Sequence, residues 1–364
     1  MSIYIVAHGG AGLHSKTSER DVRKALQKAC NQALCSTSEN ASALSAVENA
    51  ISFLEDSSLL NAGCGSNLTL DGTVECDAAI MDGQTCDYGS VGAVSGVKNP
   101  IRLARRVLEH SRVPDYLGRI PPLTLVSAGA HAFARSAHVQ LVPPESLITP
   151  RAQRQWETWK HRLDSSIAVS GLAKDSDADV FQDTVGAVAW NAISGEIASG
   201  VSSGGILLKY PGRIGEAAVF GAGCWAQALG RRSKFTMACS VSGAGEYIMK
   251  ASLARSISNA LEKDVAEVDV HEVLQRTLVD DFWIPSRSAS NPDPSAGVIL
   301  LTTDEDDNGR AMGRLWCAFT TPSMAIAYAS SENPHGKALI LRRPKVIEAR
   351  SNDHARVFVT GFTI

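Results

Sequence analysis

The chain has 364 residues, of which 44% are hydrophobic and 20% are charged, and its formal net charge is -3. This balance is typical of a globular protein with a substantial core, and it offers no basic surface to nucleic acid. No apolar run reaches the ~18 residues that a membrane-spanning helix needs, and the N-terminal "MSIYIVAHGG" predicts a strand rather than a secretory signal. We therefore expect a protein of the cytosol or the nucleus.

Hydrophobic periodicity predicts strands and helices in turn along the chain. A buried strand over 3–7 runs into the glycine-rich turn "HGGAG" at 8–12. Helices are expected over 18–35, 43–55 and 100–111, and strands over 74–81, 88–96, 184–192 and 196–202. The later part predicts helices near 244–262 and 264–281, and strands near 297–302, 312–319, 325–330 and 356–360. Strands followed by helices in each half predict an α+β fold of stacked sheets covered by helices.

The stretch 161–182, "HRLDSSIAVSGLAKDSDADVFQ", is polar and aperiodic, so we expect a flexible segment. It leads into "DTVGAVAW", where Thr184 follows Asp183 at the head of an apolar strand. In one interpretation Asp183 ends a loop and Thr184 merely opens the strand. In the other the chain is cut between them. The cut would give Thr184 a free α-amine, which can act as the base for its own hydroxyl because its ordinary pKa lies close to neutral pH.

Other motifs compete for the role of active site. "GVSSG" at 200–204 fits the G-x-S-x-G nucleophile elbow, which would make Ser202 the nucleophile. That motif needs a helix directly after it, whereas Pro211 and further glycines follow here. The histidines form no H-E-x-x-H pair, so no zinc site is predicted. The eight cysteines include no C-x-x-C pair, and their apolar neighbours favour buried free thiols over disulfides.

Seven segments of the chain, in this order, are similar to one known family. They are "HGGAG" (8–12), "NAGCGSNLTLDGTVECDAAIMDG" (61–83), "GAVSGVKNP" (92–100), "DTVGAVAW" (183–190), "VSSGG" (201–205), "PGRIGEAAVFGAGCWA" (211–226) and "VSGAGEY" (241–247). The chain resembles the asparaginase-type N-terminal nucleophile (Ntn) hydrolases. The resemblance implies a four-layer αββα sandwich formed by one domain, 1–364, and self-cleavage into an α chain of 1–183 and a β chain of 184–364. It also implies a heterodimer of these chains that pairs with a second one, and no metal or organic cofactor.

Within the family, Asp183 before the nucleophile is similar to taspase (threonine aspartase) and to the glycosylasparaginases, and the latter carry a secretory signal that this sequence does not predict. "VSSGG" and "GRIPP" (118–122) are most similar to the taspase branch. This similarity predicts a self-activating threonine endopeptidase that cuts protein substrates after aspartate; the resemblance implies that these are nuclear regulators of transcription. The alternative is a plant-type L-asparaginase with isoaspartyl dipeptidase activity. A third hypothesis is a non-catalytic binding protein on the same scaffold.

The resemblance also assigns roles to single residues. Thr184 matches the nucleophile, and Ser203 matches a second hydroxyl that bonds the nucleophile's amine; a strand-end serine capping a turn is the simpler explanation of Ser203. Arg213 matches the residue that binds a substrate carboxylate through its planar fork, against the alternative of a surface ion pair. Ser242 and Gly243 match a pair that faces the developing oxyanion.

Three more assignments complete the predicted site. Asn61 matches an asparagine near the same oxyanion, although an asparagine in a turn needs no function. Asp183 is the leaving side of self-cleavage. Glu216 stands where asparaginases have an aspartate that pairs with a free α-amine and where taspase has an uncharged glutamine, so asparaginase-like recognition stays open. The segment 151–182 lacks the paired Lys/Arg clusters of taspase, so it does not predict nuclear import.

Overall fold

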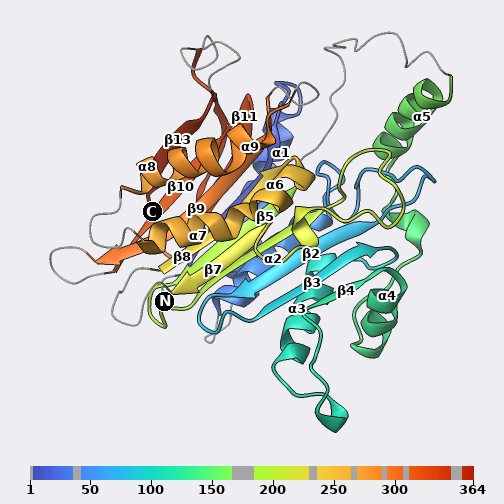
Figure 1. Ribbon diagram of the computed structural model, residues 1–364, viewed down its shortest axis with the longest axis horizontal. Helices are drawn as coiled ribbons and strands as arrows, with labels where there is room; N and C mark the ends of the chain where they lie inside the picture. Colours follow the sequence, from blue (N-terminus) through green and yellow to red (C-terminus); the bar gives the residue numbers. More distant parts are fainter. Residues whose placement is uncertain are drawn as a thin grey trace.

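Two β-sheets lie face to face between two layers of helices (Figure 1). The computed structural model describes residues 3–35, 42–165, 184–228, 236–263, 269–288, 293–305, 311–345 and 355–364. One sheet has 8 strands in the order β12-β11-β1-β5-β6-β2-β3-β4, and the other has 5 in the order β13-β10-β9-β8-β7. The expected αββα sandwich is thereby confirmed.

The 8-stranded sheet is antiparallel except where β4 pairs with β3. Its strands are β1 (Ile3–Gly12), β2 (Cys76–Asp82), β3 (Tyr88–Val94), β4 (Thr124–Val126), β5 (Val185–Asn191), β6 (Ile197–Ser203), β11 (Ser323–Ser330) and β12 (Lys337–Arg342). The antiparallel 5-stranded sheet holds β7 (Cys224–Ala228), β8 (Thr236–Gly243), β9 (Ala296–Glu305), β10 (Ala311–Phe319) and β13 (Phe358–Thr363).

Helices form the outer layers. The 8-stranded sheet is covered by α1 (Glu19–Cys35), α2 (Ala43–Glu55) and α3 (Pro100–Ser111), and the 5-stranded sheet by α6 (Gly245–Ala251), α7 (Leu253–Lys263) and α8 (Val270–Arg276), which continues into a π-helix (Thr277–Trp283) and α9 (Ile284–Ser286). Helix α4 (Ser127–Ser136) packs against β3 and β4, and α5 (Pro150–Asp164) bonds the loop before β2 through Arg151 and Trp156. Short 3-10 turns cover Tyr116–Gly118, Pro144–Leu147 and Glu216–Ala218. None of the described helices is both long enough and apolar enough to cross a bilayer.

Strand β6 shows why the central strands are buried on both faces. Along a strand, alternate residues point to opposite faces of the sheet. Ser199 faces the second sheet, where its hydroxyl donates to the Cys239 carbonyl at 2.6 Å. Gly200 faces α2, and a methyl group there would lie 2.8 Å from Val47. Residues 199, 201 and 203 therefore face the space between the sheets, and 198, 200 and 202 face the helices.

The structure differs from the expected elements at several points. The "HGGAG" segment is no turn, because β1 continues to Gly12 with a register shift between His8 and Ala11. The helix expected over 244–262 is two helices, since Ser252 adopts a left-handed conformation at φ 46°. The predicted flexible segment is partly wrong: 161–164 form the last turn of α5, and 166–183 lie outside the described residues. Strands β4, β7, β8 and β12 and helices α4 and α5 were not expected.

The eight cysteines are free thiols, as expected. Most of them are buried, and burial raises the pKa of Cys76 to about 11. Two cysteines differ from the expectation, because Cys35 and Cys86 are exposed.

Candidate active site

Thr184 is buried where the chain enters β5 between the two sheets, with 2% of its surface exposed. Its hydroxyl oxygen Oγ1 lies 3.0 Å from Ser203 Oγ at the end of β6. It also lies 2.9 Å from Oε1 of Glu216, which is the first residue of the 3-10 turn Glu216–Ala218. The structure thus brings together the candidate nucleophile, the second hydroxyl and the acid that departs from the taspase pattern.

The chain turns directly after Ser203, at Gly204 and Gly205. The Gly205 amide donates to Ser203 Oγ at 3.0 Å and fixes that hydroxyl, and Gly205 has φ 72°, which favours glycine. Asn61 holds this turn through its side chain, whose Nδ2 donates to the Gly205 carbonyl at 2.8 Å and whose Oδ1 accepts from the Asn67 amide at 2.9 Å. No bond from Asn61 to Thr184 occurs among the described residues, so its oxyanion role stays a prediction.

Glycines also surround Arg213. A methyl group at Gly205, Gly215 or Gly245 would lie 2.9, 3.0 or 3.1 Å from a terminal nitrogen of its guanidinium. At Gly245 it would also lie 2.5 Å from Glu216 Oε2, so the charged ends of Arg213 and Glu216 both border this glycine. We call Thr184, Ser203, Arg213, Glu216 and Gly245 the Thr184 site.

Arg213 is ion-paired with Glu246 at the start of α6. Its Nε donates to Glu246 Oε1 at 2.8 Å, and Nη2 lies 2.7 Å from the same oxygen. The Arg213 side chain is only 13% exposed, whereas that of Glu246 is 49% exposed. Nη2 is buried and has no hydrogen-bond partner among the described residues, because its angle to Glu246 is poor. The ion pair that was the alternative explanation exists, yet it leaves donor capacity unused.

Glu216 carries an unusual carboxyl group. Burial raises its pKa to about 7, while the Thr184 hydrogen bond and the Arg213 charge act in the opposite direction. Desolvation outweighs these partners because a buried charge loses its hydration. Near neutral pH the group can therefore exchange a proton, which is what acid–base chemistry requires.

Asp77 and Lys209 are buried charged residues that hold the loop between β6 and Glu216 in place, and sequence analysis missed both. Asp77 Oδ1 accepts from the Ala93 amide and Oδ2 from the Gly215 amide, each at 2.8 Å. Burial raises the Asp77 pKa, and the nearby Lys209 charge offsets part of this. Lys209 is 1% exposed, and its ammonium donates to the Glu75 carbonyl at 2.6 Å. Charged residues inside "VECDAAIMDG" and "ILLKYPG" were the available signal.

His8 on β1 is the second titratable side chain that contacts Thr184. Its ring is hydrogen-bonded to the Thr184 backbone and lies 2.9 Å from Ser240 Oγ through Nε2. Burial lowers the His8 pKa to about 3, against a smaller opposing effect of the Thr184 bond. The imidazole is therefore neutral and a weak base at neutral pH.

Ser242 and Gly243 end β8. The Ser242 hydroxyl accepts from the Ala11 amide at 3.1 Å, which ties the second sheet to the end of β1. Gly243 has φ 141°, and a side chain there would collide with the Ser295 carbonyl. Neither residue bonds Thr184 in the described part of the chain, so their oxyanion role stays a prediction. Asp183 lies outside the described residues.

Ser202 belongs to a different environment from Ser203. It faces the helix layer, where its hydroxyl donates to Glu55 Oε1 of α2 at 2.7 Å. A loop, not a helix, follows β6. The nucleophile elbow is therefore wrong.

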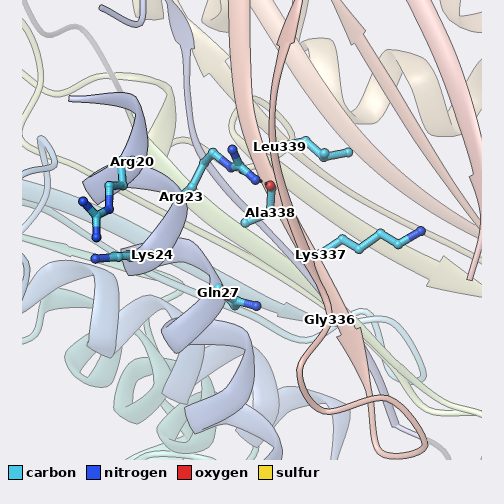
Figure 2. Close-up of a pocket in the computed structure, with 8 residues that line it drawn as sticks. All are labelled: Arg20, Arg23, Lys24, Gln27, Gly336, Lys337, Ala338 and Leu339. Carbon is cyan, nitrogen blue, oxygen red and sulfur yellow. Dashed lines mark hydrogen bonds between the residues drawn. The ribbon is translucent and has the colours of Figure 1, made fainter. Parts of the chain in front are cut away.

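A second charged region, remote from Thr184, lies between α1 and β12. This α1–β12 pocket has a volume of about 400 Å³. Its lining residues are Arg20, Arg23, Lys24, Gln27, Gly336, Lys337, Ala338 and Leu339. Figure 2 shows Arg20 and Lys24 pointing away from β12 and Lys337 pointing to the other side of the strand. Arg23 donates from Nε to the Ala338 carbonyl at 2.9 Å, so the cations do not converge on one point. No cluster of metal-ligating side chains occurs in the parts of the chain that the structure covers.

An αββα sandwich with a threonine buried at the head of a central strand defines a hydrolase of the N-terminal nucleophile class. A family model described as asparaginase matches residues 1–334. The plant-type L-asparaginase of Pyrococcus furiosus is 37% identical over 314 residues, which cover 84% of this chain and 91% of that protein. The isoaspartyl peptidase/L-asparaginase of Homo sapiens is 38% identical over 253 residues, 70% of this chain and 74% of that protein. The corresponding Xenopus laevis protein is 36% identical over 263 residues, 72% and 77% of the two chains. The chain belongs to the asparaginase family.

These names bear on the expected branch. The relatives are an asparaginase and two isoaspartyl peptidase/asparaginases, whereas the sequence motifs favoured an aspartyl endopeptidase. The comparisons thus favour the alternative hypothesis over the main one.

Proposed function

We propose that the protein is an L-asparaginase with isoaspartyl dipeptidase activity, and that Thr184 becomes its nucleophile when the chain is cut before this residue. The observation that carries the proposal is the pair of opposite charges at the Thr184 site. Arg213 Nη2 is buried without a hydrogen-bond partner, and Glu216 Oε2 borders the same glycine. Substrates of both reactions carry an α-carboxylate and a free α-ammonium group, which such a pair can hold.

The reaction follows from the positions of these groups. The α-amine of Thr184 takes the proton of its own hydroxyl, and Oγ1 attacks the side-chain carbonyl carbon of the substrate. The carbon–nitrogen bond breaks, and the leaving nitrogen takes the proton, as ammonia from asparagine or as the amine of the second amino acid released from a β-aspartyl dipeptide. Water then hydrolyses the ester and restores the hydroxyl. Ser203, held by the Gly205 amide, supplies a hydroxyl partner to Oγ1 throughout.

Arg213 explains how specificity arises. Bidentate binding of a carboxylate by a guanidinium fixes both distance and orientation. Its ion pair with Glu246 uses one edge, and the half-exposed Glu246 side chain can shift while Arg213 stays fixed among glycines. An internal aspartate of a protein offers a carboxylate but no neighbouring ammonium, so Glu216 would remain unpaired. The charge pair therefore favours a free amino acid or a β-aspartyl dipeptide.

Substrate turnover tests the proposal directly. The cut protein is incubated with L-asparagine, with a β-aspartyl dipeptide and with a peptide that contains an internal aspartate. We expect ammonia from the first and free aspartate from the second, with no cleavage of the third. Thr184→Ala is the control for contaminating hydrolases. Cleavage after the internal aspartate without turnover of asparagine would support the endopeptidase instead.

A further inference from the structure

The uncut chain lacks the base that the proposed enzyme uses. Before cleavage the Thr184 nitrogen belongs to a peptide bond and cannot accept a proton. Self-cleavage, on which the proposed function rests, therefore needs another acceptor for the hydroxyl proton. Among the described residues, the ionisable side chains bonded to Thr184 are His8 and Glu216.

Geometry distinguishes these two groups. His8 bonds the Thr184 backbone and Ser240, not the hydroxyl, and stays neutral because burial lowers its pKa to about 3. Glu216 Oε1 lies 2.9 Å from Oγ1 itself. A hydroxyl has one proton to donate, and a carboxylate is a stronger acceptor than the Ser203 hydroxyl at 3.0 Å. The proton is therefore directed to Glu216, and Ser203 can turn its own proton towards Oγ1.

We propose that Glu216 is the general base of self-cleavage. The Thr184 hydroxyl proton passes to the Glu216 carboxylate while Oγ1 forms a bond to the carbonyl carbon of residue 183. The carbon–nitrogen bond breaks, its electron pair stays on the Thr184 nitrogen, and that nitrogen takes the proton back from Glu216. The product is an ester with a free amine. Water hydrolyses the ester, so that one proton completes the Oγ1 hydroxyl and a carboxylic acid leaves.

The surroundings of Glu216 allow this role. Burial raises its pKa to about 7, so the carboxylate can accept and return a proton near neutral pH. The charged groups that face it are Asp77 from β2, which raises this pKa, and Arg213 from its own loop, which lowers it. From α6, Glu246 is ion-paired with Arg213. From β3, Tyr88 stays neutral because burial raises its pKa further.

The two roles of Glu216 follow one another in time. Cleavage creates the α-amine, which takes over as base, and Glu216 becomes free to pair with the ammonium group of a substrate. A measurement of cutting rate therefore isolates the first role from substrate binding.

The experiment follows cutting of freshly translated full-length chain by intact mass from about pH 5 to about pH 9. The variants are Glu216→Gln, Glu216→Asp, Glu216→Ala and Thr184→Ala. The matched control is Glu55→Gln, because Glu55 is also a buried carboxylate that accepts from a β6 serine hydroxyl but faces the helices. Circular dichroism checks that each variant is folded.

We expect wild-type cutting to accelerate with pH and to level off above about pH 7. Glu216→Gln should slow it by about 10²-fold or more and abolish the pH dependence. Glu216→Asp should be intermediate, and added formate should accelerate Glu216→Ala about 10-fold by entering the vacated space. Glu55→Gln should cut like wild type.

Other outcomes overturn the inference in distinguishable ways. If Glu216→Gln is cut at the wild-type rate with an unchanged pH profile, Glu216 is not the base, although the proposed function survives. If the Glu216 variants do not fold, a wild-type rate that is flat across the pH range rejects the base. If wild type itself stays uncut, the proposed function fails and this inference fails with it.

Discussion

Arginine occurs in both the Thr184 site and the α1–β12 pocket, but the two regions arrange their charged groups differently. At the Thr184 site, Glu216 bonds the threonine hydroxyl, and the charged ends of Glu216 and Arg213 border the same glycine, Gly245. In the α1–β12 pocket, the cations diverge, and Arg23 is used by a main-chain carbonyl (Figure 2). The comparison teaches that convergence of opposite groups, rather than the amount of charge, marks a functional site.

The largest expected effect comes from removing the Thr184 hydroxyl. Thr184→Ala should leave the chain uncut and reduce asparagine hydrolysis to background, because the hydroxyl is the proposed nucleophile. Intact mass and ammonia release measure the two effects. Thr184→Ser, which keeps a hydroxyl, should still be cut. Hydrolysis that persists in Thr184→Ala would exclude this threonine as the nucleophile.

Alanine substitutions of one glycine in each region should have opposite effects, one on activity and the other on stability. Gly245→Ala should lower kcat/KM by about 10²-fold with little change in stability, since the methyl group meets the ends of Arg213 and Glu216 rather than backbone. Gly336→Ala in the α1–β12 pocket should leave kcat/KM unchanged but lower the unfolding midpoint by roughly 4 °C, because Gly336 has φ 52° and its methyl group would collide with the Tyr328 carbonyl. Steady-state kinetics and thermal melts test both. If Gly336→Ala lowered kcat/KM and Gly245→Ala did not, the proposed position of the active site would be wrong.

Matched arginine substitutions sharpen the comparison. Arg213→Lys should raise KM for asparagine about 10-fold and change kcat less, because lysine keeps the charge but loses bidentate geometry. Arg23→Lys should change neither constant. If Arg213→Lys changed KM as little as Arg23→Lys does, a positive charge at residue 213 would be sufficient for binding.

The smallest effect compares Glu216 with Glu55, a buried carboxyl group on the helix side of β6. Burial raises the pKa of Glu55 to about 8 from its ordinary 4.5, and the Ser202 bond only partly opposes this. The folded protein therefore holds this proton where the unfolded chain has lost it, so stability falls as pH rises from about 4.5 to about 8. Glu55→Gln should flatten the fall in unfolding midpoint without changing activity, and Glu216 should account for part of the slope that remains. An unchanged slope would show that Glu55 titrates normally.

Local patterns were sufficient to predict stacked sheets covered by helices and to single out the segment that holds Thr184. Two strand-like runs on either side of a turn predicted β5 and β6, and motif order pointed to Thr184 and Ser203, which antiparallel strands then bring together. Strands β7 and β8 escaped prediction because "CWAQA" and "TMACSVSG" are small and mixed rather than alternating. Helix α4 escaped because it buries only Ala130 and Ala134.

The contacts of Glu216 could not be predicted, because they depend on a long loop after β6. The resemblance assigned Glu216 a role in binding the substrate amine and did not indicate a hydrogen bond to Thr184. That bond depends on the path of the loop, which Asp77 holds through the Gly215 amide. The same holds for Lys209, whose burial depends on Glu75 from a distant strand end. Such contacts join residues that no sequence period relates.

Adjacent serines on β6 have a consequence for the evolution of this strand. Ser203 serves Thr184 between the sheets, and Ser202 serves Glu55 among the helices. A slip of one residue against β5 would exchange the two hydroxyls and turn every side chain of β6 to the wrong face. An insertion or deletion in the turn at 192–196 would therefore act as an active-site mutation although no residue of that turn touches the reacting atoms.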